Sequence, residues 1–168
     1  MDADPSAIAL DGFQIFFQER RPFFVENKNI FDFSVSQSQA GNTFGSDNIF
    51  YSRRIGRSPQ GYPNTLDGEF VDQPDNTPII GAAKFSGKTK DGWAIGVLES
   101  VTAQRTATIL NGNGDTRTEM VEPLTNYFVG RLQKDFNERN SYIGGIFTAT
   151  DRENLPEQLN FLHSAAYT

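Results

Sequence analysis

The sequence has 168 residues, a formal net charge of −6 and no cysteine. This length is enough for one domain with a buried core, and the lack of cysteine excludes disulfides and thiolate metal sites. The negative charge argues against a nucleic-acid-binding protein, since contacts with phosphates need a net basic surface. We therefore expect no metal, no cofactor and no nucleic-acid partner.

The composition predicts an all-β chain. Fifteen Phe and 15 Gly accompany many Thr, Ser and Asn residues, whereas Leu is sparse. Aromatic and β-branched side chains favour the pleated surface of a sheet. No segment has the roughly 18–20 consecutive apolar residues of a membrane helix, but a barrel strand crosses a membrane with only about 9–11 residues.

The first section, residues 1–57, is rich in Phe and Arg. Its segment Phe16–Phe31 places five Phe around the run Glu19-Arg20-Arg21. The segment is too aromatic for a solvated loop and too charged for a core strand, and no regular period fits it. Pro22 disfavours a helical conformation at the residue before it. We interpret the segment as one held inside a larger structure, with its rings against a wall and its charges facing partners.

Less regular segments surround this one. Phe13–Gln18 is predicted as a short strand or as the start of the packed segment, Phe33–Asp47 as a loop and Asn48–Ile55 as a strand. Residues 58–78 contain four Pro and are predicted as a long loop. Long loops in compact folds are usually functional or mobile.

Residues 79–152 are predicted as a β-meander. Ile79–Lys88 and Trp93–Gln104 flank an Asp-Gly pair, which is typical of a hairpin turn. The remaining predicted strands are Thr106–Leu110, Thr116–Val121, Asn126–Phe136 and Ser141–Thr150. The trailing segment, residues 153–168, has no predicted element, and no helix is predicted anywhere.

The long strands have two different faces. In Asn126–Phe136, for example, Phe128 and Leu132 share one face, and Tyr127 and Arg131 share the other. An apolar face opposite a face of Lys, Arg, Gln, Tyr and Thr suits a wall between lipid and water. A soluble β-sandwich also alternates in this way, so the pattern alone leaves both architectures open.

Several runs of the sequence resemble, in the same order, a family of large proteins of Gram-negative bacteria. The resemblance is to the N-terminal part of a region that is taken to be an outer-membrane β-barrel and follows a family-nine-like carbohydrate-binding domain. That region is usually called a domain of unknown function. The runs are DADP, FFQERRPFFVENKNIF, NIFYSRRIGR, IIGAAKFSGKTKDGWAIGVLESVT, VEPLTNYFVGRLQKDF and SYIGGIFTATDR.

The resemblance implies a location in the cell outer membrane, contact with lipid, and a role in uptake or surface handling of a polysaccharide or oligosaccharide. It implies no catalytic residues. We expect an antiparallel up-and-down meander that forms part of a transmembrane β-barrel, with residues 1–168 as the N-terminal section of one barrel domain. About six strands cannot close a barrel, because the smallest single-chain outer-membrane barrels have eight, so the chain is predicted to be a fragment.

The candidate site consists of charged residues from the first section. As a binding site it would face the lumen and hold anionic or sugar ligands, because guanidinium groups bind carboxylate or phosphate bidentately. As an internal charge network it would neutralise buried arginines, with Asp32 as a further acid, and fix the Phe-rich segment in place. The candidate residues are Glu19, Arg20, Arg21, Glu26, Arg53, Arg54 and Arg57.

Two other functions stay open at this stage. A carbohydrate-active hydrolase would need two carboxylates at a fixed separation across one bond, and no spacing in the sequence marks such a pair. A soluble β-rich binding module would need only the alternating strands. We expect the chain not to be an enzyme.

Overall fold

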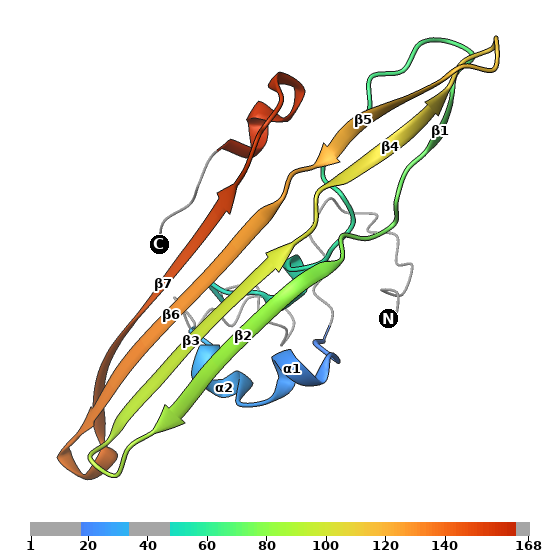
Figure 1. The fold of residues 1–168 in the computed structure, drawn as a ribbon. Coiled ribbons are helices and arrows are strands. Elements are labelled where there is room, and N and C mark those ends of the chain that lie inside the picture. Colours follow the sequence, from blue (N-terminus) through green and yellow to red (C-terminus); the bar gives the residue numbers. More distant parts are fainter. Residues whose placement is uncertain (1–17, 34–47, 164–168) are drawn as a thin grey trace, which may run out of the picture.

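The computed structural model describes residues 18–33 and 48–163. Its main element is a long four-stranded antiparallel sheet (Figure 1). The strand order is β2-β3-β6-β7, so chain neighbours pair up and down except where β4 and β5 intervene. The strands are β2 (Ile79–Lys88), β3 (Trp93–Thr102), β6 (Thr125–Phe136) and β7 (Ser141–Arg152).

A second, three-stranded sheet forms an arm that continues one end of the first (Figure 1). Its order is β1-β4-β5, with β1 at Phe70–Asp72, β4 at Arg105–Leu110 and β5 at Thr116–Glu122. At the tip, the side-chain oxygen of Asn111 accepts a hydrogen bond from the backbone N of Asp115 (2.8 Å). β4 follows β3 closely and β5 leads directly into β6, so the middle two strands of the meander run on into the arm.

The meander has the predicted strands. The β2–β3 hairpin closes at Gly92, whose φ of +84° is readily adopted only by glycine. Predicted and observed bounds agree for β2 and differ by one or two residues for β3 to β7. Strand β1 was not predicted, because its three residues lie within the segment predicted as a loop, residues 58–78. The prediction of a mostly β chain with antiparallel strands is confirmed, but the sheets are not closed into a barrel. Among the described residues, β2 and β7 each have one strand neighbour only.

The first section of the chain differs from its prediction. Residues Pro22–Val25 form a one-turn helix α1, and Lys28–Phe31 form a second, α2. The strand predicted at Asn48–Ile55 is wrong, because Ser52–Arg54 form a 3₁₀ turn, η1. The prediction for Phe33–Asp47, and most of that for Phe13–Gln18, concern residues outside the described ranges. Two further 3₁₀ turns are η2 (Asn137–Arg139) and η3 (Glu157–His163).

The core lies between this first section and one face of the four-stranded sheet. Helices α1 and α2 lie along that face (Figure 1). Their buried residues and Ile55 pack against Leu98 and Val129, which are 1% and 2% exposed. Gly96 on β3 lets α2 approach closely, since a Cβ there would lie 2.8 Å from the side chain of Ile30. None of the described helices is long and apolar enough to cross a membrane.

Candidate functional site

The two faces of the four-stranded sheet differ sharply in what lies against them. We call the face under α1 and α2 the covered face. On this face Lys84 is paired with Leu98, and Leu98 is paired with Val129. Arg131 follows two residues after Val129 on β6 and shares the same face. We call the opposite side the open face. The predicted alternation is present but imperfect, because the covered face also holds the apolar core residues Leu98 and Val129.

The open face is apolar, and its side chains are exposed. Phe85 is 66% exposed and Ile143 is 67% exposed. The other large apolar side chains of this face that are more than a third exposed are Trp93, Val97, Leu132, Phe136 and Phe147. Charged residues occur near its two ends. Lys134 lies over the ring of Trp93 at one end, and Glu99 accepts a hydrogen bond from Asn126 at the other (3.3 Å).

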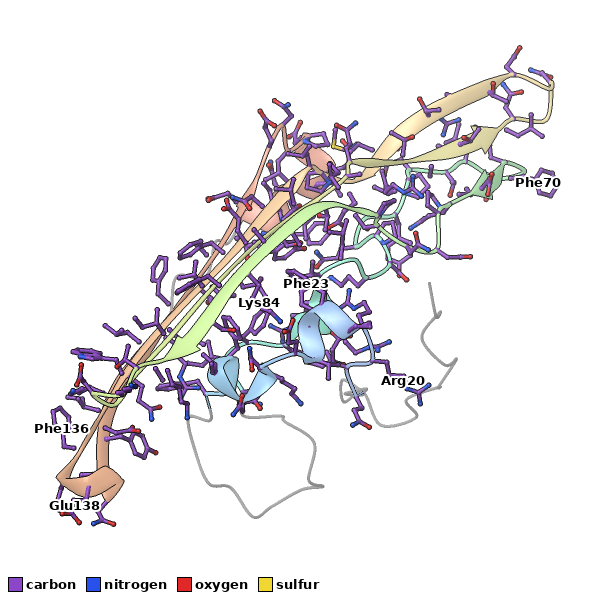
Figure 2. All side chains as sticks on the ribbon, turned by 60° about the horizontal axis from the view of Figure 1, so that its bottom comes forward. Arg20, Phe23, Phe70, Lys84, Phe136 and Glu138 are labelled. Carbon is purple, nitrogen blue, oxygen red and sulfur yellow. The ribbon has the colours of Figure 1, made fainter. Side chains whose placement is uncertain are left out.

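On the covered face, Lys84 of β2 holds helix α1. Its ammonium group donates hydrogen bonds to the backbone oxygens of Phe23 and Glu26. It also lies 5.1 Å from the centre of the Phe23 ring, and Figure 2 shows the two side chains directed toward each other. The last carbonyl groups of a helix have no partner within the helix. Lys84 therefore donates hydrogen bonds to carbonyl groups that have no partner within a one-turn helix.

Arg131 of β6 does the same for helix α2. Its Nη1 lies 3.2, 2.7 and 2.6 Å from the backbone oxygens of Asn29, Ile30 and Asp32. Its guanidinium also lies 5.6 Å from the centre of the Phe33 ring. The side-chain oxygen of Gln133 accepts from its other terminal nitrogen (2.8 Å). One cation on the sheet thus fixes both the end of α2 and the residues that follow it.

Arg21 joins the two parts of the Phe- and Arg-rich section. Its two terminal nitrogens donate to the backbone oxygens of Ile55 (2.7 Å) and Ser52 (2.9 Å), at the η1 turn. The guanidinium also lies 4.3 Å from the centre of the Phe24 ring. The turn brings two carbonyl oxygens toward one guanidinium, whereas successive carbonyls of a strand point to opposite sides. This accounts for a turn, rather than the predicted strand, at these residues.

Glu19 neutralises Arg21. Glu19 is 7% exposed. Its carboxylate accepts hydrogen bonds from Nε and Nη2 of Arg21 (2.9 and 2.7 Å) and from the hydroxyl of Ser52 (2.6 Å). The backbone N–H groups of Arg20 and Arg21 donate to the same carboxylate. Burial by itself would raise the pKa of Glu19, but the hydrogen bonds from Arg21 and Ser52 outweigh it and hold the pKa below its ordinary value. The group therefore stays ionised at neutral pH.

The other candidate residues do not join this pair. Arg20 is exposed and points away from the sheet (Figure 2). The carboxylate of Glu26 is exposed, and only its backbone takes part in the contacts described above. Arg53 donates to the backbone oxygen of Gln18 (3.1 Å). Arg54 is exposed, and Arg57 is half-buried at a separate position on the covered face.

The sequence reasoning placed Lys84 and Arg131 on the polar face but did not include them among the candidate residues. Their partners are backbone carbonyls 58 to 102 residues earlier in the chain, and no sequence pattern marks such a pairing. On its own face Lys84 has the small residues Ala82 and Ser86 as its neighbours along the strand, which marks it as a single long cation. Arg131 has no such signal, because Gly130 lies on the open face.

The arm has its own charge cluster, away from the candidate residues. Arg117 of β5 pairs with the carboxylates of Glu69 and Glu119 and donates to the backbone oxygen of Asn64 (2.7 Å). The hydrogen bond from Arg117 lowers the pKa of Glu69 to about 2. These contacts tie the loop before β1 to β5. In the described ranges 18–33 and 48–163, no group of three or more His, Cys, Asp or Glu is arranged to hold a metal ion.

Comparison with known proteins gives one match. A family described as "Domain of unknown function (DUF5916)" matches residues 1–161. No curated protein and no solved structure matches the chain.

Proposed function

We propose that this chain, which belongs to the DUF5916 family, forms part of the wall of an outer-membrane β-barrel protein. In this proposal the open face of the sheet contacts lipid, and the Phe- and Arg-rich section lies on the inner side of the wall. The protein would act in uptake or surface handling of a polysaccharide-related substrate. The substrate class rests only on the sequence resemblance, whereas the membrane location also has structural support.

The observation that carries the proposal is the inversion of the two faces. In a soluble protein the apolar face of a sheet is the one that other elements cover. Here α1 and α2 cover the face that bears Lys84 and Arg131 beside the apolar core, while Phe85 and Phe147 are exposed on the other. Transmembrane barrels have this arrangement, with apolar side chains outward and polar side chains inward.

The size of the apolar band supports the same proposal. On β6 it extends from Phe128 to Phe136, with Lys134 as its one charged member. Eight residue steps of a strand span about 26 Å. A tilt of about 40° would reduce the height to about 20 Å, slightly less than the ~25 Å apolar band of known barrels.

The ends of the band have the side chains expected of a membrane interface. Trp93 lies at the hairpin end, beside Lys134, and aromatic and basic residues are favoured at the level of lipid headgroups. Glu99, Asn126 and Asp151 lie toward the other end, where the arm begins. With these residues near the interfaces, the middle of the open face contains no charged side chain.

A membrane location also requires partners for the two sheet edges. Unpaired backbone N–H and C=O groups are not tolerated in lipid, so β2 and β7 must pair with other strands there. The proposal therefore implies that further strands, from additional chain or from other copies, continue this sheet on both sides.

The test is the behaviour of the full-length protein in a Gram-negative host. We expect it in the outer-membrane fraction, resistant to extraction by salt and urea and released by detergent. We also expect unheated protein to migrate differently from heated protein in SDS gels, as closed barrels do. Recovery as a monodisperse protein without detergent, with one cooperative melting transition, would instead support the soluble binding module.

A further inference from the structure

A second group of charges lies on the covered face, separate from Glu19 and Arg21. It is centred on Arg57, two residues after Ile55, which packs in the core on this face. The charged or ionisable groups that act on Arg57 are Tyr127, Glu122, Arg54 and Arg152. The group thus brings together three guanidiniums and one carboxylate.

The strand register places two of these groups next to each other. Tyr127 of β6 is paired with Thr150 of β7, and Arg152 is two residues further along the same strand. Such diagonal neighbours on one face are about 7–8 Å apart at the backbone, within reach of long side chains. On the other side of β6, Thr102 of β3 is paired with Thr125, two residues before Tyr127. The floor of the group is therefore formed by three adjacent strands.

The single carboxylate does not neutralise the cluster. Glu122 is 2% exposed, and its Oε2 accepts a hydrogen bond from the backbone N of Gln60 (2.8 Å). Within the described part of the chain, no carboxylate oxygen lies within 4.0 Å of the guanidinium nitrogens of Arg57 or Arg152. Burial lowers the pKa of Arg57; Tyr127 and Glu122 raise it, and the cations Arg54 and Arg152 lower it. A surplus of positive charge is thus held where it is partly removed from water.

Three buried nitrogens at this place have no acceptor among the described residues. They are Nε of Arg57, Nε of Arg152 and the side-chain nitrogen of Gln60. Buried donors are nearly always hydrogen-bonded, and an unpaired buried charge is costly. Nη1 of Arg152 does have a partner, the backbone oxygen of Leu162 (2.8 Å). The side chain is therefore fixed in position while its Nε stays available.

We propose that this group, which we call the arginine cluster (Arg54, Arg57 and Arg152), binds an oxyanion, either a carboxylate or a phosphate. Planar guanidinium groups match the geometry of both anions and donate two hydrogen bonds at once. Arg57 and Arg152 would hold the anion from within, and the exposed Arg54 would lie at the entrance. The inference does not require that the open face contacts lipid, so it can fail or succeed independently of the proposed membrane location.

The test is isothermal titration calorimetry of the folded full-length protein at constant ionic strength. The probes are inorganic phosphate, glucuronate and glucose, because glucuronate and glucose differ mainly in one carboxylate. We expect phosphate or glucuronate to bind and glucose not to bind. Arg57→Gln and Arg152→Gln should each raise the Kd at least about tenfold, the usual effect of losing a hydrogen bond to a charged group.

Two further variants keep the test decisive. Lys88→Gln removes an exposed positive charge elsewhere on β2 and should leave the Kd unchanged. If Arg57→Gln does not fold, Arg54→Gln replaces it, because Arg54 is exposed and should tolerate the change. The proposal is overturned if neither anion binds, or if the Lys88 variant loses as much affinity as the cluster variants.

Discussion

The two faces of the four-stranded sheet are stabilised in different ways. On the covered face, three cations donate to main-chain carbonyls of three short turns: Lys84 to α1, Arg131 to α2 and Arg21 to η1. On the open face, Phe85, Ile143 and Phe147 are about half exposed or more, and the ring of Phe147 contacts that of Phe128 on the neighbouring strand. The chain itself covers one surface, and the other leaves apolar side chains exposed, which is typical of surfaces that contact a partner or a membrane.

This comparison shows how Lys84 and Arg131 on the sheet can be stabilised by main-chain carbonyls in place of carboxylates. Carbonyl oxygens at the ends of one-turn helices are acceptors without an internal partner. A cation from the sheet satisfies two or three of them at once, and the hydrogen bond to a charged donor is stronger than a neutral one. The short helices and the cations therefore stabilise each other, and neither is expected to persist without the other.

The largest effect is expected from loss of the Glu19 charge on the covered side. Glu19→Gln removes the negative charge that pairs with Arg21. It also removes one of the two carboxylate oxygens that accept hydrogen bonds from Arg21 and Ser52. We expect the free energy of unfolding to fall by about 3 kcal/mol, the low end of the range for breaking a buried pair, because the Arg21 side chain is 34% exposed.

Chemical denaturation measures this change, and Glu26→Gln is the matched control. The carboxylate of Glu26 is exposed, so its variant should stay within about 0.5 kcal/mol of the wild type. Equal stability of the two variants would contradict the role given to Glu19.

The open face gives the next prediction. Phe147→Lys places a charge within the apolar band, next to Gly130 on β6. If this face contacts lipid, the change should cost about 2 kcal/mol, the low end of the midplane range because Phe147 lies nearer one end of the band; unfolding the protein from lipid vesicles measures it. In a soluble protein the same exposed substitution would be nearly neutral. If the variant is as stable as the wild type in vesicles, the claim that the open face contacts lipid is contradicted.

A smaller effect is expected from the cation that holds α2. Arg131→Met keeps an unbranched side chain but leaves the carbonyls of Asn29, Ile30 and Asp32 without their donor. We expect a loss of about 1–3 kcal/mol. Amide hydrogen exchange should accelerate at residues 28–33 more than in the β2–β3 hairpin. Uniform acceleration across the sheet would show that Arg131 stabilises the strands rather than the helix.

The smallest effect is a dependence on pH. The folded-state pKa of Glu19 lies below its ordinary value of 4.5 because hydrogen bonds from Arg21 and Ser52 outweigh burial. Its contribution is therefore complete above this ordinary value and is lost as the pH falls through the folded-state pKa. The stability difference between wild type and Glu19→Gln should be smaller at about pH 3 than at about pH 6. A difference independent of pH would contradict this assignment.

The strands were predictable because their signal is local. Period-two alternation assigns Phe128 and Leu132 to one face and Tyr127 and Arg131 to the other, and the paired strands have these faces. The Asp-Gly pair likewise fixes the β2–β3 turn at Gly92, where a positive φ is required.

The short helices were not predictable for the opposite reason. A single turn is too short to give a periodic signal or to be stable alone. The partner that completes α1 is Lys84, 58 residues after Glu26 in the chain, and the partner of α2 is Arg131, still further away. The sequence pattern also could not predict whether the sheet closes into a barrel. Alternation describes the two faces of each strand, but it does not identify the strands that pair with β2 and β7.

The central claim is that the open face contacts lipid and the covered face does not. The sequence has no cysteine, so single cysteines can be placed at Leu132, Gln133, Phe147 and Thr148 and labelled with a fluorophore. In vesicles containing nitroxide-labelled lipid, we predict strong quenching at Leu132 and Phe147 and weak quenching at Gln133 and Thr148. Equal quenching at all four positions, or none at any, would contradict the account.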